Sequence, residues 1–354
     1  MFRNKLESYK NYEVKEDNWS IKLDANENQF PLDEKLKEQI RKALMENMDN
    51  IRFYPENNSD ALREELGKFY GLQKKNFIVG NGSDQLIQII MQAVCEKGEA
   101  ILILSPSFVM YRITAGLLDI EVLPVPFGAN WQIDTDEIIN KARDSRVKAV
   151  FLDTPNNPTG ILINRKDISR IAEGIKGKLL VVDAAYSEFS PWDYVDLVEK
   201  HENLIVLKTF SKMGFAGIRC GYAVSSENII DYLHRVKPPY NVSYFTQVTA
   251  IEVLRNFDRV KQNIQKTIEE REKLKRKIRD LKFEVIDGYG NFVSLVGKGL
   301  EDLQKFLGSK GIAVRYFPFE SGFKDGSGLL RITVGTEGQN KELLKALEEW
   351  RDRK

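Results

Sequence analysis

The sequence predicts an α/β protein in which helices cover a mostly parallel sheet, together with a smaller α+β domain. Between residues 77 and 207, short runs of continuous aliphatic residues alternate with segments of helical apolar spacing. Strands without polar alternation are typical of sheets that are covered on both faces. After Pro239 the chain continues as a long charged helix, followed by a mixture of short strands and helices. A chain of 354 residues is long enough for two such units.

We divide the chain into three parts. Residues 1–41 form an N-terminal arm and part of the small domain, residues 42–240 form the large domain, and residues 241–354 form a connecting helix and the small C-terminal domain. A helix over 33–48 is expected to cross the first boundary. The large domain is expected to contain a helix over 60–70, strands at 77–79, 101–104, 147–152, 179–182 and 204–207, and helices between them. The last part is expected to contain a helix over 243–281 with a break near Asn256, strands at 283–286, 292–296, 313–316 and 329–334, and helices at 300–307 and 341–350.

The composition excludes several classes of function. With 53 basic and 52 acidic residues, the net charge of +1 gives no reason to expect nucleic acid or an anionic membrane as a partner. The N-terminus lacks the apolar core of a signal peptide and no run approaches a membrane span, so we expect a cytoplasmic protein. Cys95 and Cys220 lie in apolar surroundings and are expected to be reduced core thiols. With only His201 and His234, a His-based triad or a metal site is disfavoured, and proton transfer falls to Lys, Asp, Glu or Tyr.

A glycine-rich turn at residues 80–84, Gly-Asn-Gly-Ser-Asp, follows the first predicted strand and leads into a helix. It lacks the last glycine of a dinucleotide fingerprint, and no Gly-Lys-Ser/Thr follows a glycine loop, which disfavours a P-loop. The turn is a natural phosphate cradle, because the free N–H groups of a helix N-terminus bind anions. An ordinary helix cap formed by Ser83 or Asp84 is an equally good interpretation.

The segment after residues 204–207 carries Thr209, Ser211, Lys212 and Arg219. A lysine held near hydroxyls and an arginine could form a Schiff base with a phosphorylated aldehyde, whose phosphate the other groups would bind. Taken alone this signal is weak, because a lysine after a strand is usually a solvated loop residue.

Three other strand ends strengthen the signal. Asp183 ends an apolar strand, and a buried carboxylate needs a cationic partner or several donors. A protonated aromatic nitrogen would supply that cation, and Tyr186 follows one turn later. Asn157 could be only a turn former, and Phe108 only a core residue. In combination, these residues with the phosphate cradle, the lysine and the arginine specify pyridoxal 5′-phosphate (PLP), since ligands bind at the carboxyl ends of parallel strands.

Several motifs resemble a known family. Asn-Pro-Thr-Gly at 157–160, Asp-Ala-Ala-Tyr at 183–186 and Ser-Lys at 211–212 with Arg219 are similar to the fold-type I PLP aminotransferases. The resemblance narrows to the histidinol-phosphate aminotransferases through the motifs at residues 23–28, 52–55, 80–84, 239–242 and 330–336, which span nearly the whole chain. Gln29-Phe30-Pro31 departs from the family's proline–aromatic–glycine continuation, and Phe108 stands where tyrosine is common.

The resemblance implies a role for each matching residue. The catalytic residues would be Lys212, which carries the cofactor and moves the proton, with Asp183 and Tyr186. The remaining cofactor ligands would be Gly82, Ser83, Asp84, Phe108, Asn157, Thr209, Ser211 and Arg219, with Tyr54 supplied by the neighbouring subunit of a homodimer. The substrate would be bound by Asn26, Tyr54, Asn157, Arg315 and Arg331.

Arg331 and Arg315 belong to predicted strands with apolar neighbours, so each guanidinium needs an anion or several acceptors. The resemblance implies that both bind the phosphate of one substrate and a carboxylate of the other. Structural ion pairs with Asp or Glu are the alternative.

The activity implied by the resemblance is amino transfer between L-histidinol phosphate and 2-oxoglutarate, giving imidazole-acetol phosphate and L-glutamate in histidine biosynthesis. L-threonine-O-3-phosphate decarboxylation and a broader aromatic amino transfer are alternatives on the same scaffold. A catalytically silent PLP-fold binding domain is disfavoured because all the chemical positions are filled. A cofactor-free Schiff-base lyase would leave Asp183 without a partner.

Overall fold

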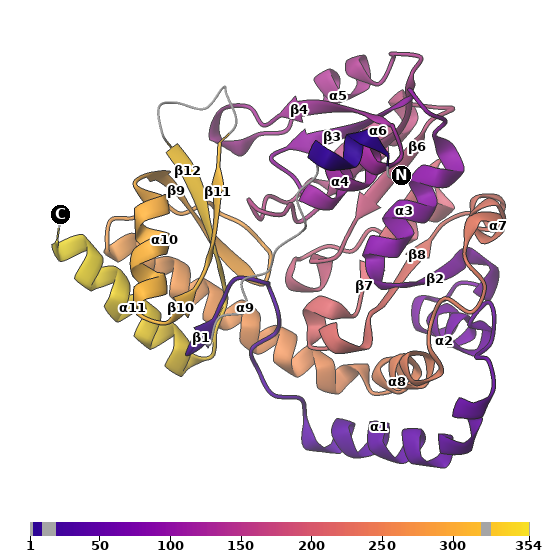
Figure 1. The fold of residues 1–354 in the computed structure, drawn as a ribbon, viewed down its shortest axis with the longest axis horizontal. Coiled ribbons are helices and arrows are strands. Elements are labelled where there is room, and N and C mark those ends of the chain that lie inside the picture. Colours follow the sequence, from indigo (N-terminus) through magenta and orange to yellow (C-terminus); the bar gives the residue numbers. More distant parts are fainter. Residues whose placement is uncertain (1–2, 9–18, 320–326, 354) are drawn as a thin grey trace.

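The computed structural model describes residues 3–8, 19–319 and 327–353. Figure 1 shows a larger part built on one wide sheet and a smaller part built on a second sheet, with the long helix α9 (Phe257–Asp280) between them. Within the described residues, no helix is both long and apolar enough to cross a bilayer.

The wide sheet has seven strands. In spatial order they are β2 (Phe77–Asn81), β8 (Cys220–Val224), β7 (Leu204–Thr209), β6 (Leu179–Asp183), β5 (Val147–Asp153), β3 (Ala100–Ser105) and β4 (Glu121–Pro126). β8 is antiparallel to both of its neighbours, and the pairings from β7 through β4 are parallel. The expectation of a mostly parallel α/β sheet is therefore confirmed.

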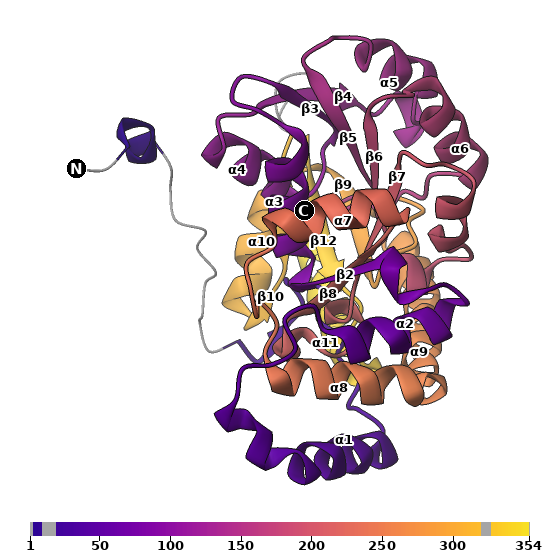
Figure 2. The same cartoon turned by 90° about the vertical axis from the view of Figure 1, so that its right-hand side faces the viewer.

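Both faces of this sheet are buried, which explains the continuous aliphatic runs. Along β6, Leu179 and Val181 belong to one core cluster, whereas Leu180 and Val182 belong to another. One face packs against α3 (Gly82–Val94), α4 (Val109–Leu117) and α7 (Glu227–Val236). The other face packs against α2 (Asp60–Tyr70), α5 (Thr135–Lys141), α6 (Arg165–Gly174) and α8 (Tyr244–Arg255). Figure 2 shows α3 and α4 on one side of the strands and α5 and α6 on the other.

The smaller part is an antiparallel sheet with the order β11 (Arg315–Pro318), β12 (Ser327–Thr333) and β9 (Phe292–Lys298). Its core is shared with α9, α10 (Leu300–Ser309) and α11 (Glu337–Asp352). The N-terminal segment joins this part, because β1 (Ile21–Lys22) pairs in parallel with β10 (Ile312–Ala313). The chain then crosses back through α1 (Glu34–Glu46), which packs on α8.

Short 3-10 helices complete the described elements; they are Asn4–Ser8, Met48–Arg52, Lys74–Asn76, Ala129–Trp131, Ser187–Phe189, Val195–Glu199, Ser211–Met213 and Ala216–Ile218. The break near Asn256 is confirmed, since this residue separates α8 from α9.

Some predicted elements were wrong. Residues 283–286 form no regular strand, because only Val285 bridges to Leu295. The strand expected at 313–316 is two short strands separated at Val314. β4 was missed because Pro124 and Pro126 interrupt its pattern, which an edge strand tolerates.

The three-part division of the chain remains a prediction. The boundary at residue 41 falls inside α1. α8 lies beyond residue 240 but packs on α1 and α2.

Candidate active site

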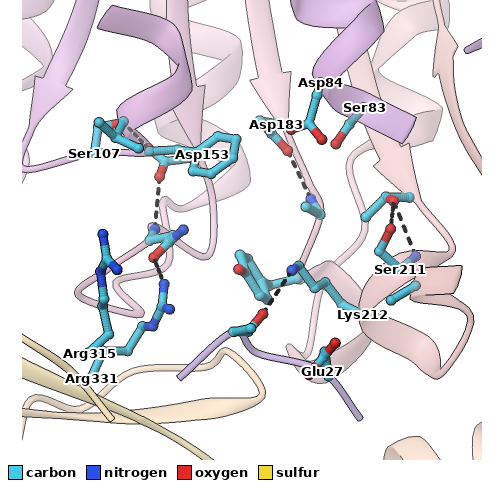
Figure 3. A pocket seen from close by; sticks show the side chains of 18 of the residues that line it. Glu27, Ser83, Asp84, Ser107, Asp153, Asp183, Ser211, Lys212, Arg315 and Arg331 are labelled. Carbon is cyan, nitrogen blue, oxygen red and sulfur yellow. Dashed lines mark hydrogen bonds between the residues drawn. The ribbon is translucent and has the colours of Figure 1, made fainter. Parts of the chain in front are cut away.

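A cavity of about 300 Å³ lies where the carboxyl ends of the wide sheet face the smaller part of the molecule (Figure 3). It gathers twelve of the residues singled out in the sequence: Ser83, Asp84, Phe108, Asn157, Asp183, Tyr186, Thr209, Ser211, Lys212, Arg219, Arg315 and Arg331. The same wall contains Asp24, Ala25, Glu27, Ser107, Val109, Asp153, Ala185, Ala216 and Phe317.

Lys212 lies in the 3-10 helix that directly follows β7. Its Nζ is 3.3 Å from the Ala25 carbonyl oxygen and 5.8 Å from the ring centroid of Tyr186. The amine therefore projects into the cavity between the strand ends and the N-terminal segment, with a neutral acceptor beside it. A lysine in this position can act as a nucleophile toward an aldehyde.

Asp183 is the last residue of β6 and only 4% of its surface is exposed. Its carboxylate accepts hydrogen bonds from Tyr111 Oη at 2.7 Å and from the Ala185 N–H at 3.1 Å. Burial raises the pKa of Asp183 to about 7, with a further upward contribution from Asp153, although the Tyr111 hydrogen bond opposes the shift. A cationic nitrogen in the cavity would favour the ionised carboxylate.

The N-terminus of α3 forms a cradle of donors with the Lys212 segment. Gly82 has a φ of +74°, and a Cβ there would lie 2.7 Å from Nη2 of Arg219. A Cβ on Gly221 would lie 2.5 Å from the Ser83 nitrogen, so only glycine lets β8 approach the helix start this closely. Arg219 also donates to Asp84 Oδ2 at 2.8 Å.

Two hydroxyls extend this cradle. Thr209 Oγ1 donates to Ser211 Oγ at 3.0 Å, and both side chains line the cavity. Hydroxyls, helix N–H groups and a guanidinium together suit a phosphate.

Asn26 has a position that the sequence did not reveal. It is fully buried, it does not line the cavity, and its Nδ2 donates to Tyr186 Oη at 2.9 Å. The Tyr186 hydroxyl thus accepts from Asn26 and keeps its own proton to donate. The predicted substrate contact of Asn26 remains a prediction.

Arg331 and Arg315 are brought together by strand pairing. They are direct partners in the register of β11 and β12, and both line the cavity. Arg331 is 7% exposed; its Nη1 donates to Asn157 Oδ1 at 2.5 Å and its Nη2 donates to the Asp24 carbonyl. Both of these acceptors are neutral oxygen atoms.

Sequence reasoning missed three residues of the cavity region, namely Asp153, Ser107 and Tyr111. Asp153 is 3% exposed, and burial raises its pKa to about 6. It ends β5 beside Asp183 at the end of β6, so the strand-end rule that selected Asp183 applies to it equally. Tyr111 follows Phe108 by three residues on the buried face of α4.

Tyr54 and Gly82 are the other predicted residues that do not line the cavity. Tyr54 is 82% exposed and stacks on Tyr240 with ring centroids 4.7 Å apart. Gly82 is buried directly before Ser83 at the start of α3.

These residues fit PLP. The donor cradle at the start of α3 suits its phosphate, the buried Asp183 suits its ring nitrogen, and Lys212 suits its aldehyde. Arg315 and Arg331 line the same cavity.

Comparisons with known proteins agree with a PLP-binding site, because they identify aminotransferases. The family model for aminotransferase class I and II matches residues 20–347. Histidinol-phosphate aminotransferase from Pyrococcus furiosus is 38% identical over 346 residues, covering 97% of this chain and 96% of that protein. The protein of the same name from Ruminiclostridium cellulolyticum is 35% identical over 352 residues, covering 98% and 97%.

The fold has close structural relatives as well. The crystal structure of histidinol-phosphate aminotransferase from Sinorhizobium meliloti in complex with pyridoxal-5′-phosphate superimposes with a TM-score of 0.86. The match covers 95% of this chain and 91% of that one, at 22% sequence identity. At 22% identity this similarity supports a shared fold and nothing more.

Proposed function

The chain belongs to the class I and II aminotransferases, within the histidinol-phosphate aminotransferase family, and on this premise we propose that it transfers the amino group of L-histidinol phosphate to 2-oxoglutarate. The products are imidazole-acetol phosphate and L-glutamate, a step of histidine biosynthesis. The choice of a phosphorylated substrate is supported by Arg315 and Arg331, which line the cavity on the side opposite Lys212 (Figure 3). A planar guanidinium can bind a phosphate in one half-reaction and a carboxylate in the next.

The cofactor PLP supplies the electron sink for breaking the bonds at the amine-bearing carbon. Lys212 Nζ is the base that removes the proton from that carbon, because it is the cavity amine next to a neutral carbonyl oxygen. Asp183 holds a proton on the ring nitrogen, and the hydrogen bond from Tyr111 fixes its carboxylate in place.

Tyr186 and Asn157 hold the ring hydroxyl in this proposal. Asn26 fixes the Tyr186 hydroxyl at 2.9 Å, and Arg331 fixes the Asn157 amide oxygen at 2.5 Å. Both donors are therefore oriented before the cofactor and substrate bind, which reduces the cost of binding. Phe108 supports the ring face, and Ser83, Thr209, Ser211 and Arg219 bind the phosphate.

We also propose a cytoplasmic homodimer whose partner subunit supplies Tyr54 to the cofactor phosphate. The support is that Tyr54 is highly exposed and absent from the lining of its own cavity. Its stacking partner Tyr240 is exposed as well, as are Phe53 and Ile51 of the same segment, and exposed apolar side chains of this kind suit a symmetric interface.

The test is a panel of phosphorylated and unphosphorylated amines incubated with PLP-loaded protein and 2-oxoglutarate. Histidinol phosphate should give glutamate at the highest kcat/KM, and histidinol should be much poorer. Aromatic amino acids as the best donors would favour the broader aminotransferase. Carbon dioxide release from threonine phosphate without any keto acid would favour the decarboxylase.

A further inference from the structure

Asp153 is a buried carboxylate in the cavity wall that has no role in the reaction as described above. It ends β5, and its Cα is paired in the sheet register with that of Asp183 at the end of β6. Two carboxylates on adjacent strand ends repel each other when both are ionised. A buried carboxylate at this position therefore needs stabilising contacts.

The donors around Asp153 supply a reason. Ser107 Oγ donates to Oδ1 at 2.7 Å, Asn156 Nδ2 donates to the same oxygen at 2.9 Å, and the Asn157 N–H donates to Oδ2 at 2.8 Å. One side chain therefore ties the loop after β3 to the loop after β5 (Figure 3). The first loop continues into Phe108, and the second carries Asn157.

The connection continues into the smaller part of the molecule. Arg331 Nη1 donates to Asn157 Oδ1 at 2.5 Å. Asn157 is thus held through its backbone N–H by Asp153 and through its amide oxygen by Arg331. These two contacts favour one orientation of the Asn157 amide. In this orientation Asn157 Nδ2 can donate to the ring hydroxyl of the cofactor.

We propose that Asp153 is a positioning residue that holds the Phe108 and Asn157 loops in the arrangement that binds the cofactor ring. The inference rests on the proposed function, since it needs PLP in the cavity. An ionised carboxylate suits this task because it only accepts hydrogen bonds, whereas an amide has one accepting oxygen and would turn its NH₂ group toward a donor.

The experiment compares Asp153→Asn and Asp153→Ala with Thr154→Val as a matched control. Thr154 is the next residue of the same loop and is fully buried, but it does not line the cavity. Its Oγ1 bonds Tyr194 Oη at 2.9 Å and accepts the Ile163 N–H at 2.9 Å. Its substitution removes the hydrogen bonds with Tyr194 and Ile163 and should destabilise the fold there, while the hydrogen bonds that Asp153 accepts from Ser107, Asn156 and Asn157 remain.

Two readouts are measured on each variant: the dissociation constant of PLP from the apoprotein, and the pH midpoint of the visible absorbance of the bound cofactor. Asp153→Asn should raise the dissociation constant about tenfold, the factor for one lost hydrogen bond of about 1.4 kcal/mol. Asp153→Ala should raise it further, because all three donors lose their acceptor. Thr154→Val should lower the melting temperature and leave both readouts unchanged.

The sign of the shift in the pH midpoint separates positioning from simple charge removal. If only the negative charge of Asp153 mattered, its removal would destabilise the protonated Schiff-base nitrogen at Lys212 and lower the pH midpoint of the absorbance. Displacing Asn157 removes a hydrogen-bond donor from the ring oxygen of the cofactor. The negative charge on that oxygen then stabilises the protonated Schiff-base nitrogen at Lys212 more strongly, so the pH midpoint of the absorbance rises. We expect a rise in both Asp153 variants.

An unchanged dissociation constant, or a midpoint that falls, would show that Asp153 does not position the ring contacts. If the variants fail to fold, Ser107→Ala provides the second test: it removes one donor to Asp153, and a PLP dissociation constant unchanged within twofold would count against the proposal. Wild-type protein that binds no PLP would contradict the proposed function, and this inference with it.

Discussion

Replacing Arg331 by lysine keeps the positive charge at the cavity wall and removes the two-nitrogen geometry. In the structure, separate nitrogens of Arg331 reach Asn157 Oδ1 and the Asp24 carbonyl, and the side chain is 7% exposed. Lysine has one nitrogen, so it cannot donate to two oxygen atoms of one phosphate through a planar fork as arginine can. The loss of one charge-assisted hydrogen bond costs about 1.5–3 kcal/mol, which is about tenfold to a hundredfold in kcat/KM.

The assay measures kcat/KM of Arg331→Lys for histidinol phosphate and for unphosphorylated histidinol. The loss should fall mainly on the phosphorylated amine, because only that substrate presents the anion. Arg315→Lys is the matched control, since Arg315 is the cross-strand partner of Arg331 but is exposed, and a solvated charge contributes less. We expect its loss to be smaller than that of Arg331→Lys.

Equal losses for both amines, or no loss for either, would refute this reasoning. Equal losses with a weakened affinity for PLP would show that Arg331 acts through Asn157 instead. No loss would mean that the phosphate is bound elsewhere in the cavity.

Three further predictions follow from the same site. Borohydride reduction should leave a pyridoxyl group on the Lys212 peptide, and Lys212→Ala should lose nearly all turnover; a label on another lysine would contradict the assignment. The pKa of Asp183 rises from 3.8 to about 7 on folding, so the folded apoprotein loses stability as the pH rises from about 5 to about 8. Relative to Asp183→Asn, the wild-type free energy of unfolding, measured in urea, should fall by about 3 kcal/mol over this range. A difference that does not change with pH would argue against the raised pKa. Mixed dimers of Tyr54→Phe and Lys212→Ala subunits, both inactive alone, should regain activity through one intact site, and no recovery in proven heterodimers would exclude a shared site.

The sequence was informative where chemistry follows a regular strand. Asp183 and Lys212 could be selected because each follows an apolar run, and parallel strands bring their carboxyl ends to one edge. The same logic applies to Asp153, which directly follows the strand expected at 147–152, but it was not selected because it precedes a proline-rich turn.

Long-range pairing was beyond what the sequence could predict. Arg331 and Arg315 are adjacent because β11 and β12 pair in one register, and a shift of one residue would place their side chains on opposite faces. Asn26 reaches Tyr186 from 160 positions away in the chain, and no local pattern encodes that contact. These contacts depend on how the N-terminal segment and the smaller sheet pack against the strand ends.

The central claim is that this cavity moves an amino group from a phosphorylated amine to a keto acid. The most direct test uses L-histidinol phosphate labelled with ¹⁵N at its amino group, with PLP-loaded protein and 2-oxoglutarate, followed by mass spectrometry of the glutamate formed. The account predicts ¹⁵N-glutamate in amounts equal to the imidazole-acetol phosphate produced, and none with Lys212→Ala. Consumption of the amine without label in glutamate, or no consumption by fully loaded enzyme, would contradict it.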